Sequence, residues 1–213
     1  MQELMQKHYE QLARATITQL RRRGFEAEWF STAEEAKAAA LRLLPEGCTV
    51  AWGGSATIRD MGLTEAVHAG NWKVIDRDLA KTPEERAELH RQGLLSDWYL
   101  MSANAISAEG VLVNIDGTGN RVSATLFGHE KVYFVIGRNK LAPTYEAAVY
   151  RARNVAAPQR ARQLGKKTPC AVKADRCYDC RSPERVCRAL VTLWGPMLGM
   201  ETEVLLVDED LGL

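Results

Sequence analysis

The 213-residue chain has no long apolar run, few aromatic residues and almost no excess of charge. No run approaches the roughly 20 apolar residues of a membrane-spanning helix, and the opening MQELMQKHYEQ lacks the apolar region of a signal peptide. The net charge of +1, from 28 basic and 27 acidic residues, creates no global field toward nucleic acid or membranes. We therefore expect a cytoplasmic protein with no membrane span and no nucleic-acid partner.

Several well-known catalytic patterns are also missing. The chain has neither the GxxxxGK[ST] of a P-loop nor the GxGxxG of a dinucleotide fold, so no nucleotide cofactor is indicated. It has no HExxH, and its four histidines stand without a paired serine or cysteine nucleophile. The sequence thus supports a binding site better than it supports a particular reaction.

The first half of the chain alternates between strand and helix patterns. Short apolar runs at residues 25–30, 48–52, 72–75 and 98–101 are separated by helical patterns, after an amphipathic helix at residues 3–23. Thr32 and Thr82 are placed to cap two of these helices. This alternation predicts an α/β fold with a mostly parallel, Rossmann-like sheet and helices on both faces.

The second half changes character after residue 102. Apolar runs at residues 111–115, 122–127 and 132–136 follow one another quickly and predict an antiparallel or mixed section of the same sheet. A long helix follows a Thr144 cap and is expected to be interrupted near Pro158. A helix over residues 183–194 is one option before a last strand at 203–207.

Polar and glycine-rich clusters follow several of the predicted strands. GGSAT (residues 53–57) stands between a strand and a helix, an arrangement that places N–H groups and hydroxyls at a helix N-terminus, although it also suits an ordinary turn. In parallel sheets, ligands bind beyond the carboxyl ends of strands, where residues 53–57 and 102–104 are expected to meet. An anionic small molecule is the ligand that these loops favour.

Two further clusters, DGTGNR (116–121) and GRNK (137–140), supply charged groups. Asp116 could act as a general base or simply form an ordinary Asp-Gly turn. Arg121 could bind a carboxylate or simply be exposed on a strand. Lys140 could stabilise an enolate or another anion. The candidate catalytic residues in these clusters are therefore Asp116 and Lys140. The candidate ligand-binding residues are Gly53, Gly54, Ser55, Thr57, Asn104, Gly117, Thr118, Gly119, Asn120, Arg121, Gly137, Arg138 and Asn139.

Four of the five cysteines are close together in the sequence. Cys170, Cys177, Cys180 and Cys187 have the spacing C-x6-C-x2-C-x6-C, which lets four thiolates converge on one zinc ion or one [4Fe-4S] cluster. The alternatives are a reactive dithiol at Cys177 and Cys180 and a core position for Cys187. Cys48, inside an apolar strand, is expected to be a core residue.

Five segments together resemble the LUD-domain proteins, the family of the lactate-utilisation protein C. They are GGSATIRDMGL (53–63), SANAISAEG (102–110), NIDGTGNR (114–121), GRNK (137–140) and VDEDLGL (207–213). The resemblance implies an α/β domain like those of ribose-5-phosphate isomerase, glucosamine-6-phosphate deaminase and the CoA-transferases, whose ligands are sugar phosphates or CoA esters. It also places Glu109 where CoA-transferases carry a nucleophilic glutamate, which makes Glu109 a third catalytic candidate.

The resemblance further implies a role in lactate or hydroxy-acid utilisation with iron–sulfur protein partners. We expect a LUD-type domain at 1–165, a cysteine-bearing insertion at 166–190 and a closing strand segment at 191–213, with a homodimer as the default assembly. The main hypothesis is an enzyme, or a subunit of one, that binds a small anionic molecule. The alternatives are a non-catalytic metal- or cluster-binding accessory or sensor module, and an isomerase or CoA-transferase-like enzyme acting on a sugar phosphate or CoA ester.

Overall fold

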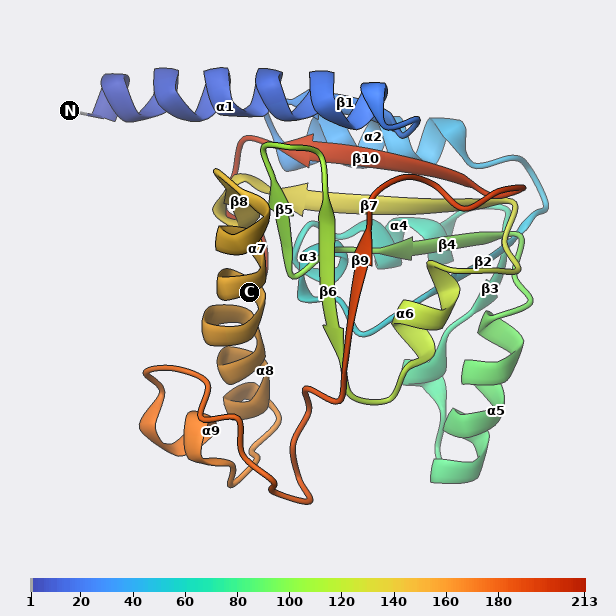
Figure 1. The fold of residues 1–213 in the computed structure, drawn as a ribbon. Coiled ribbons are helices and arrows are strands. Elements are labelled where there is room, and N and C mark those ends of the chain that lie inside the picture. The colour runs from blue at the N-terminus through green and yellow to red at the C-terminus, as the bar shows by residue number, and fades with distance from the viewer. Residues whose placement is uncertain (1) are drawn as a thin grey trace.

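The computed structural model describes residues 2–213, and its centre is a six-stranded, wholly parallel sheet (Figure 1). The strand order is β1-β10-β7-β4-β2-β3, so the chain crosses over repeatedly, with helices between the strands. The strands are β1 (Glu26–Phe30), β2 (Thr49–Trp52), β3 (Lys73–Ile75), β4 (Trp98–Met101), β7 (Lys131–Gly137) and β10 (Glu201–Val207).

A second, smaller sheet packs beside the first, in the order β8-β5-β6-β9. β6 pairs antiparallel with both β5 and β9, whereas β5 and β8 are parallel. The strands are β5 (Ala105–Ser107), β6 (Leu112–Asp116), β8 (Leu141–Ala142) and β9 (Ala189–Leu193).

Helices surround both sheets. The α-helices are α1 (Gln2–Arg22), α2 (Ala33–Leu43), α3 (Ala56–Asp60), α4 (Leu63–Ala69), α5 (Pro83–Gly93), α6 (Asn120–Ala124), α7 (Tyr145–Arg151), α8 (Ala157–Gln163) and α9 (Pro169–Lys173). Short 3-10 turns occur at η1 (Arg77–Leu79) and η2 (Arg138–Lys140), and a π-helical turn occurs at η3 (Ala152–Ala156). Within residues 2–213, no helix is long and apolar enough to cross a membrane.

The central sheet is buried on both faces, as its strand sequences require. Along β7, Phe134 and Ile136 point into a core shared with α1 and the small sheet. Tyr133 and Val135, which alternate with them, point into a second core formed with α2, α3 and α4. The α/β class with a mostly parallel sheet and helices on both faces is therefore confirmed.

The helix predicted after Thr144 forms a column along the small sheet (Figure 1). It contains the expected irregularity near Pro158, because the π-helical turn η3 immediately precedes α8. Small side chains such as Ala148 and Ala152 let the column approach Val113 of β6 closely. The column thus provides a wall beside the carboxyl ends of the strands.

Three of the predictions for the second half are wrong. Residues 122–127 are not a strand, because Gly119 takes a left-handed conformation (φ 94°) and starts helix α6, whose Val122 and Ala124 are buried. Residues 111–115 do form a strand, but in a separate sheet rather than in an extension of the central one. Residues 183–194 are not helical, since β9 pairs with the edge of β6.

Candidate functional site

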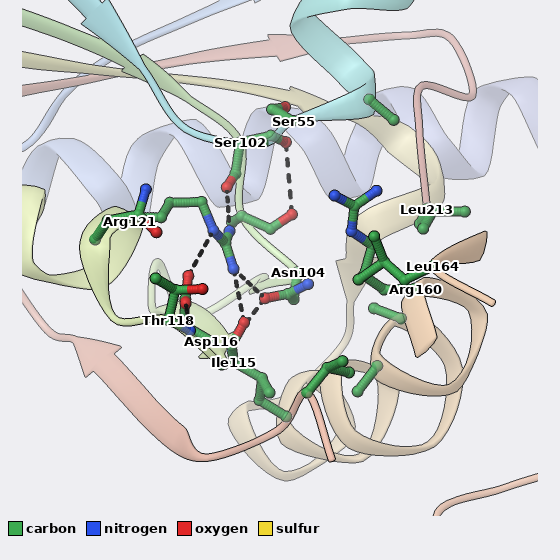
Figure 2. Close-up of a pocket in the computed structure, with 18 of the residues that line it drawn as sticks. Ser55, Ser102, Asn104, Ile115, Asp116, Thr118, Arg121, Arg160, Leu164 and Leu213 are labelled. Carbon is green, nitrogen blue, oxygen red and sulfur yellow. Dashed lines mark hydrogen bonds and ion pairs between the residues drawn. The ribbon is translucent and has the colours of Figure 1, made fainter. Parts of the chain in front are cut away.

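A pocket of about 390 Å³ opens beyond the carboxyl ends of β2, β4 and β6 (Figure 2). The turn after β2, the segment after β4, the loop after β6 and Lys140 form one side. Ala156, Arg160 and Leu164 of the helical column form another, and the segment from Pro183 to Val186 contributes a third. Residues selected because they follow strands therefore line this pocket, while its other walls come from parts of the chain distant in sequence.

The two glycines after β2 allow arginine side chains to approach the backbone closely. A Cβ atom at Gly54 would lie 2.5 Å from Arg77 Nη2, and one at Gly53 would lie 3.1 Å from the side chain of Arg121. Ser55 then caps α3 by accepting a hydrogen bond from Ile58 N–H. Glycine is needed at both positions because arginine side chains of the same chain come so close to this backbone.

Arg121 organises the side of the pocket formed by the strands (Figure 2). Its guanidinium has five N–H donors, and each has an acceptor within the protein. Arg121 therefore holds the loops together rather than presenting free donors to a carboxylate. The acceptors are Asp116 Oδ2 at 3.2 Å, Ser102 O at 2.9 Å, Asn114 Oδ1 at 3.0 Å, Asn104 Oδ1 at 3.0 Å and Ile115 O at 2.7 Å.

Asp116 belongs to the same hydrogen-bond network as Arg121. Its Oδ1 accepts hydrogen bonds from the backbone N–H groups of Thr118 (2.9 Å) and Gly119 (2.8 Å), and its Oδ2 accepts from Arg121. These bonds fix the turn that starts α6. Asp116, Gly117, Thr118 and Asn120 line the pocket, whereas Gly119 does not.

Lys140 lies in the pocket wall with only 3% of its surface exposed. Its Nζ donates to Thr57 Oγ1 at 2.7 Å and to Ser102 Oγ at 3.0 Å, and no carboxylate of the described residues lies within ion-pair distance. Burial, followed by the positive charges of Arg151 and Arg121, lowers the pKa of Lys140 to about 7. Two hydroxyl acceptors match the two N–H donors of a neutral amine, which leaves its lone pair available.

Two arginines that the sequence analysis did not select complete the site. Arg77, after β3, and Arg160, from α8, both bring Nη2 to the backbone of Gly54. Figure 2 shows Arg160 across the cavity from Arg121. Burial, followed by the nearby charges of Arg59, Arg77 and Arg121, lowers the pKa of Arg160. Arg77 could have been selected because it follows a strand, β3. No local sequence pattern distinguishes Arg160 from other helix arginines.

The remaining candidates lie elsewhere. Arg138 forms an ion pair with Asp210 at 3.0 Å, and Asn139 holds the backbone of Leu211, so this part of the GRNK segment fastens the residues after β10. Glu109 accepts the N–H of Tyr145 at the start of α7 at 2.9 Å, outside the pocket lining. Gly53 and Gly137 also lie outside the lining.

The four clustered cysteines line one small cavity beside the main pocket. In the part of the chain that the structure describes, no three His, Cys, Asp or Glu side chains stand in a metal-ligating arrangement. Cys48 was expected inside a strand as a core residue, but it immediately precedes β2 and is only partly buried against the core that β2 shares with α2, α3 and α4.

Fold and site together define an α/β protein with a strongly cationic pocket at the ends of a parallel sheet. A family model described as the LUD domain matches residues 13–207, and the chain therefore belongs to the LUD-domain family.

Among solved structures, the chain is similar to the crystal structure, at 1.70 Å resolution, of a DUF162 family protein from Deinococcus radiodurans. The two share 16% sequence identity over 93% of this chain and 98% of the other, with a TM-score of 0.55. At this identity the likeness shows the fold alone. The comparison with curated proteins found no match.

Proposed function

We propose that this LUD-domain protein binds a small anionic molecule in the pocket between Gly54 and Arg160. The observation that carries the proposal is the convergence of Arg77 and Arg160 on the Gly54 backbone. Arg77 Nε is buried and has no hydrogen-bond partner among the described residues, and burying such a donor unpaired is unfavourable. A phosphate or carboxylate bound in the pocket would offset the positive charge of the two guanidiniums.

The pocket volume limits the size of the ligand. About 390 Å³ holds a whole hydroxy acid or sugar phosphate, whereas a CoA ester would place only its acyl end inside. Similarity to the lactate-utilisation protein C favours a hydroxy acid and, through it, iron–sulfur protein partners. Similarity to the sugar-phosphate isomerases and deaminases favours a phosphorylated sugar. Both classes carry the anionic group and the hydroxyls that the pocket suits.

Lys140 is the residue we propose for chemistry. A neutral amine held between Thr57 and Ser102 can take a proton from a bound substrate and stabilise the anion that forms. Asp116 lines the same pocket, but its hydrogen bonds to the turn assign it first to holding the loop. The Glu109 carboxylate accepts the N–H of the first residue of α7, and this position gives no support to a role as a CoA-transferase nucleophile.

Isothermal titration calorimetry tests the proposal. Inorganic phosphate, L-lactate and ribose 5-phosphate would be titrated into the wild type, Arg160→Gln and, as a matched control, Arg162→Gln, which changes an exposed arginine two residues along α8. We expect at least one anion to bind, the Arg160→Gln variant to lose about tenfold in affinity, roughly 1.4 kcal/mol, and Arg162→Gln to lose nothing. Equal affinity in all three proteins, or no binding of any anion, would overturn the proposal.

A further inference from the structure

The four cysteines of the segment C-x6-C-x2-C-x6-C surround a cavity of about 10 Å³ between α8, α9 and the irregular chain that follows. Cys170 comes from α9, and the other three come from residues 174–188, which form no helix or strand. The rest of the lining is partly apolar, from Ala157, Pro158, Ala161 and Val186, and partly polar, from Arg153, Thr168 and Arg185. A space of this size accommodates one ion or one water molecule and is too small for a four-iron cluster.

The turn between Cys177 and Cys180 is shaped around a sulfur atom. The N–H of Asp179 donates to Cys177 Sγ at 3.3 Å, and Asp179 takes a left-handed conformation (φ 44°) that is uncommon outside glycine. A second hydrogen bond joins Cys170 Sγ and Thr168 Oγ1 at 3.3 Å, and either atom can be its donor. Hydrogen bonds to sulfur orient thiolate ligands and balance part of their charge.

Two arginines bring positive charge to the same cavity. Arg153 and Arg185 line it together with the four cysteines. Arg185 also links the segment by donating to Cys180 O at 2.8 Å and to Cys187 O at 3.1 Å. A divalent ion held by four thiolates keeps a net negative charge, which two neighbouring guanidiniums would offset.

We propose that these four thiols bind one thiophilic divalent cation of the zinc class. Binding forms four metal–sulfur bonds and releases the four thiol protons to solvent. Because the thiols are not in a ligating arrangement, the metal must draw them inward. That movement is open to residues 174–182, which carry Cys177 and Cys180 and belong to no helix or strand.

The proposed metal site also shapes the anion pocket. Arg185 and Val186 line both cavities. The neighbouring chain is fastened to the Asp116 loop, where Arg188 N–H donates to Asp116 O at 2.8 Å and a Cβ at Gly117 would lie 2.6 Å from Val186 O. Metal binding would therefore fix the third wall of the pocket. This consequence rests on the proposed anion site, whereas the metal site does not.

Cobalt(II) titration into reduced, metal-free protein tests the metal site directly. We expect one equivalent to bind, with thiolate-to-cobalt charge transfer and the intense visible bands of tetrahedral cobalt, and zinc to displace it. Cys180→Ser should weaken binding by more than about 100-fold, beyond what losing a second-shell partner costs, while Cys48→Ser should leave it unchanged. Sub-stoichiometric binding, a weak octahedral spectrum, or assembly of iron and sulfide instead of one ion would overturn the proposal.

The second measurement compares the affinity for inorganic phosphate with and without zinc. We expect metal-free protein to bind phosphate several-fold more weakly and to be cut by trypsin at Arg176 and Arg181, which are exposed. Equal phosphate affinity would overturn the coupling while leaving the stoichiometry result intact. If phosphate binds in neither state but cobalt binds stoichiometrically, the anion site fails and the metal site stands.

Discussion

Two loops of this protein look alike in sequence and serve different purposes. DGTGNR (116–121) and GRNK (137–140) each follow an apolar strand and each contain glycine, asparagine and arginine. Arg121 of the first is 13% exposed and makes five hydrogen bonds inside the pocket rim. Arg138 of the second is 32% exposed and pairs with two aspartates. Only Lys140 of the second loop reaches the pocket.

The difference shows what a strand-end motif can establish. Position beyond a strand brings a residue to the correct edge of the sheet. Whether its side chain builds the site, binds the ligand or fastens another segment depends on what packs opposite. For Arg121 the opposite groups are carbonyl and amide oxygens of β6 and the segment after β4, and for Arg138 they are Asp208 and Asp210.

The largest effect expected from this comparison follows Arg121→Ala. The change leaves several partly buried acceptors unpaired and should lower the free energy of unfolding by roughly 3–5 kcal/mol. Urea unfolding followed by circular dichroism would measure the loss. A variant as stable as the wild type would mean that the rim does not depend on this guanidinium.

A smaller effect is expected from Lys140→Met. Because the pKa of Lys140 is lowered to about 7 in the folded protein and is about 10.4 in the unfolded chain, the unfolded state binds more protons between these values. Stability due to this group should therefore rise with pH from 7 toward 10. Between pH 7 and pH 9, the wild type should gain about 2–3 kcal/mol relative to Lys140→Met.

Urea unfolding of both proteins at the two pH values would measure that difference. If wild type and variant respond to pH identically, Lys140 remains protonated in the folded protein, and its proposed role as proton acceptor is lost.

The smallest effect is expected from Arg138→Gln. Its ion pairs are partly exposed, so the free energy of unfolding should change by no more than about 1 kcal/mol. Phosphate affinity should stay at the wild-type value, since Arg138 lies outside the pocket lining. A large loss of phosphate affinity in this variant would mean that the two loops share one function after all.

Much of the fold was predictable because parallel strands buried on both faces leave short, dense apolar runs such as residues 98–101 and 132–136. Residues 122–127 were wrongly predicted to form a strand because their β-branched and apolar residues fit one. The deciding feature, the left-handed conformation of Gly119, is not visible in an apolar pattern. The small sheet was missed as a separate unit because β9 joins it from 73 residues beyond the end of β6, at Ala189.

For the pocket, only its place in the fold was predictable. Gly54, Thr57, Asn104 and Lys140 were all selected from strand ends and do line one pocket. The roles of Arg121 and Asp116 could not be predicted, because satisfaction of every guanidinium donor is a property of the folded loops. Arg160 comes from a helix whose distance from β2 only the tertiary structure fixes.

The central claim, an anion held between Arg77 and Arg160 over Gly54, is tested most directly by an anomalous-scattering oxyanion. Crystals would be soaked in tungstate or selenate and measured at the absorption edge of the heavy atom. We predict an anomalous peak within hydrogen-bonding reach of both guanidiniums and of the turn that begins at Gly54. Anions bound elsewhere on the surface, with none between these two arginines, would contradict the account.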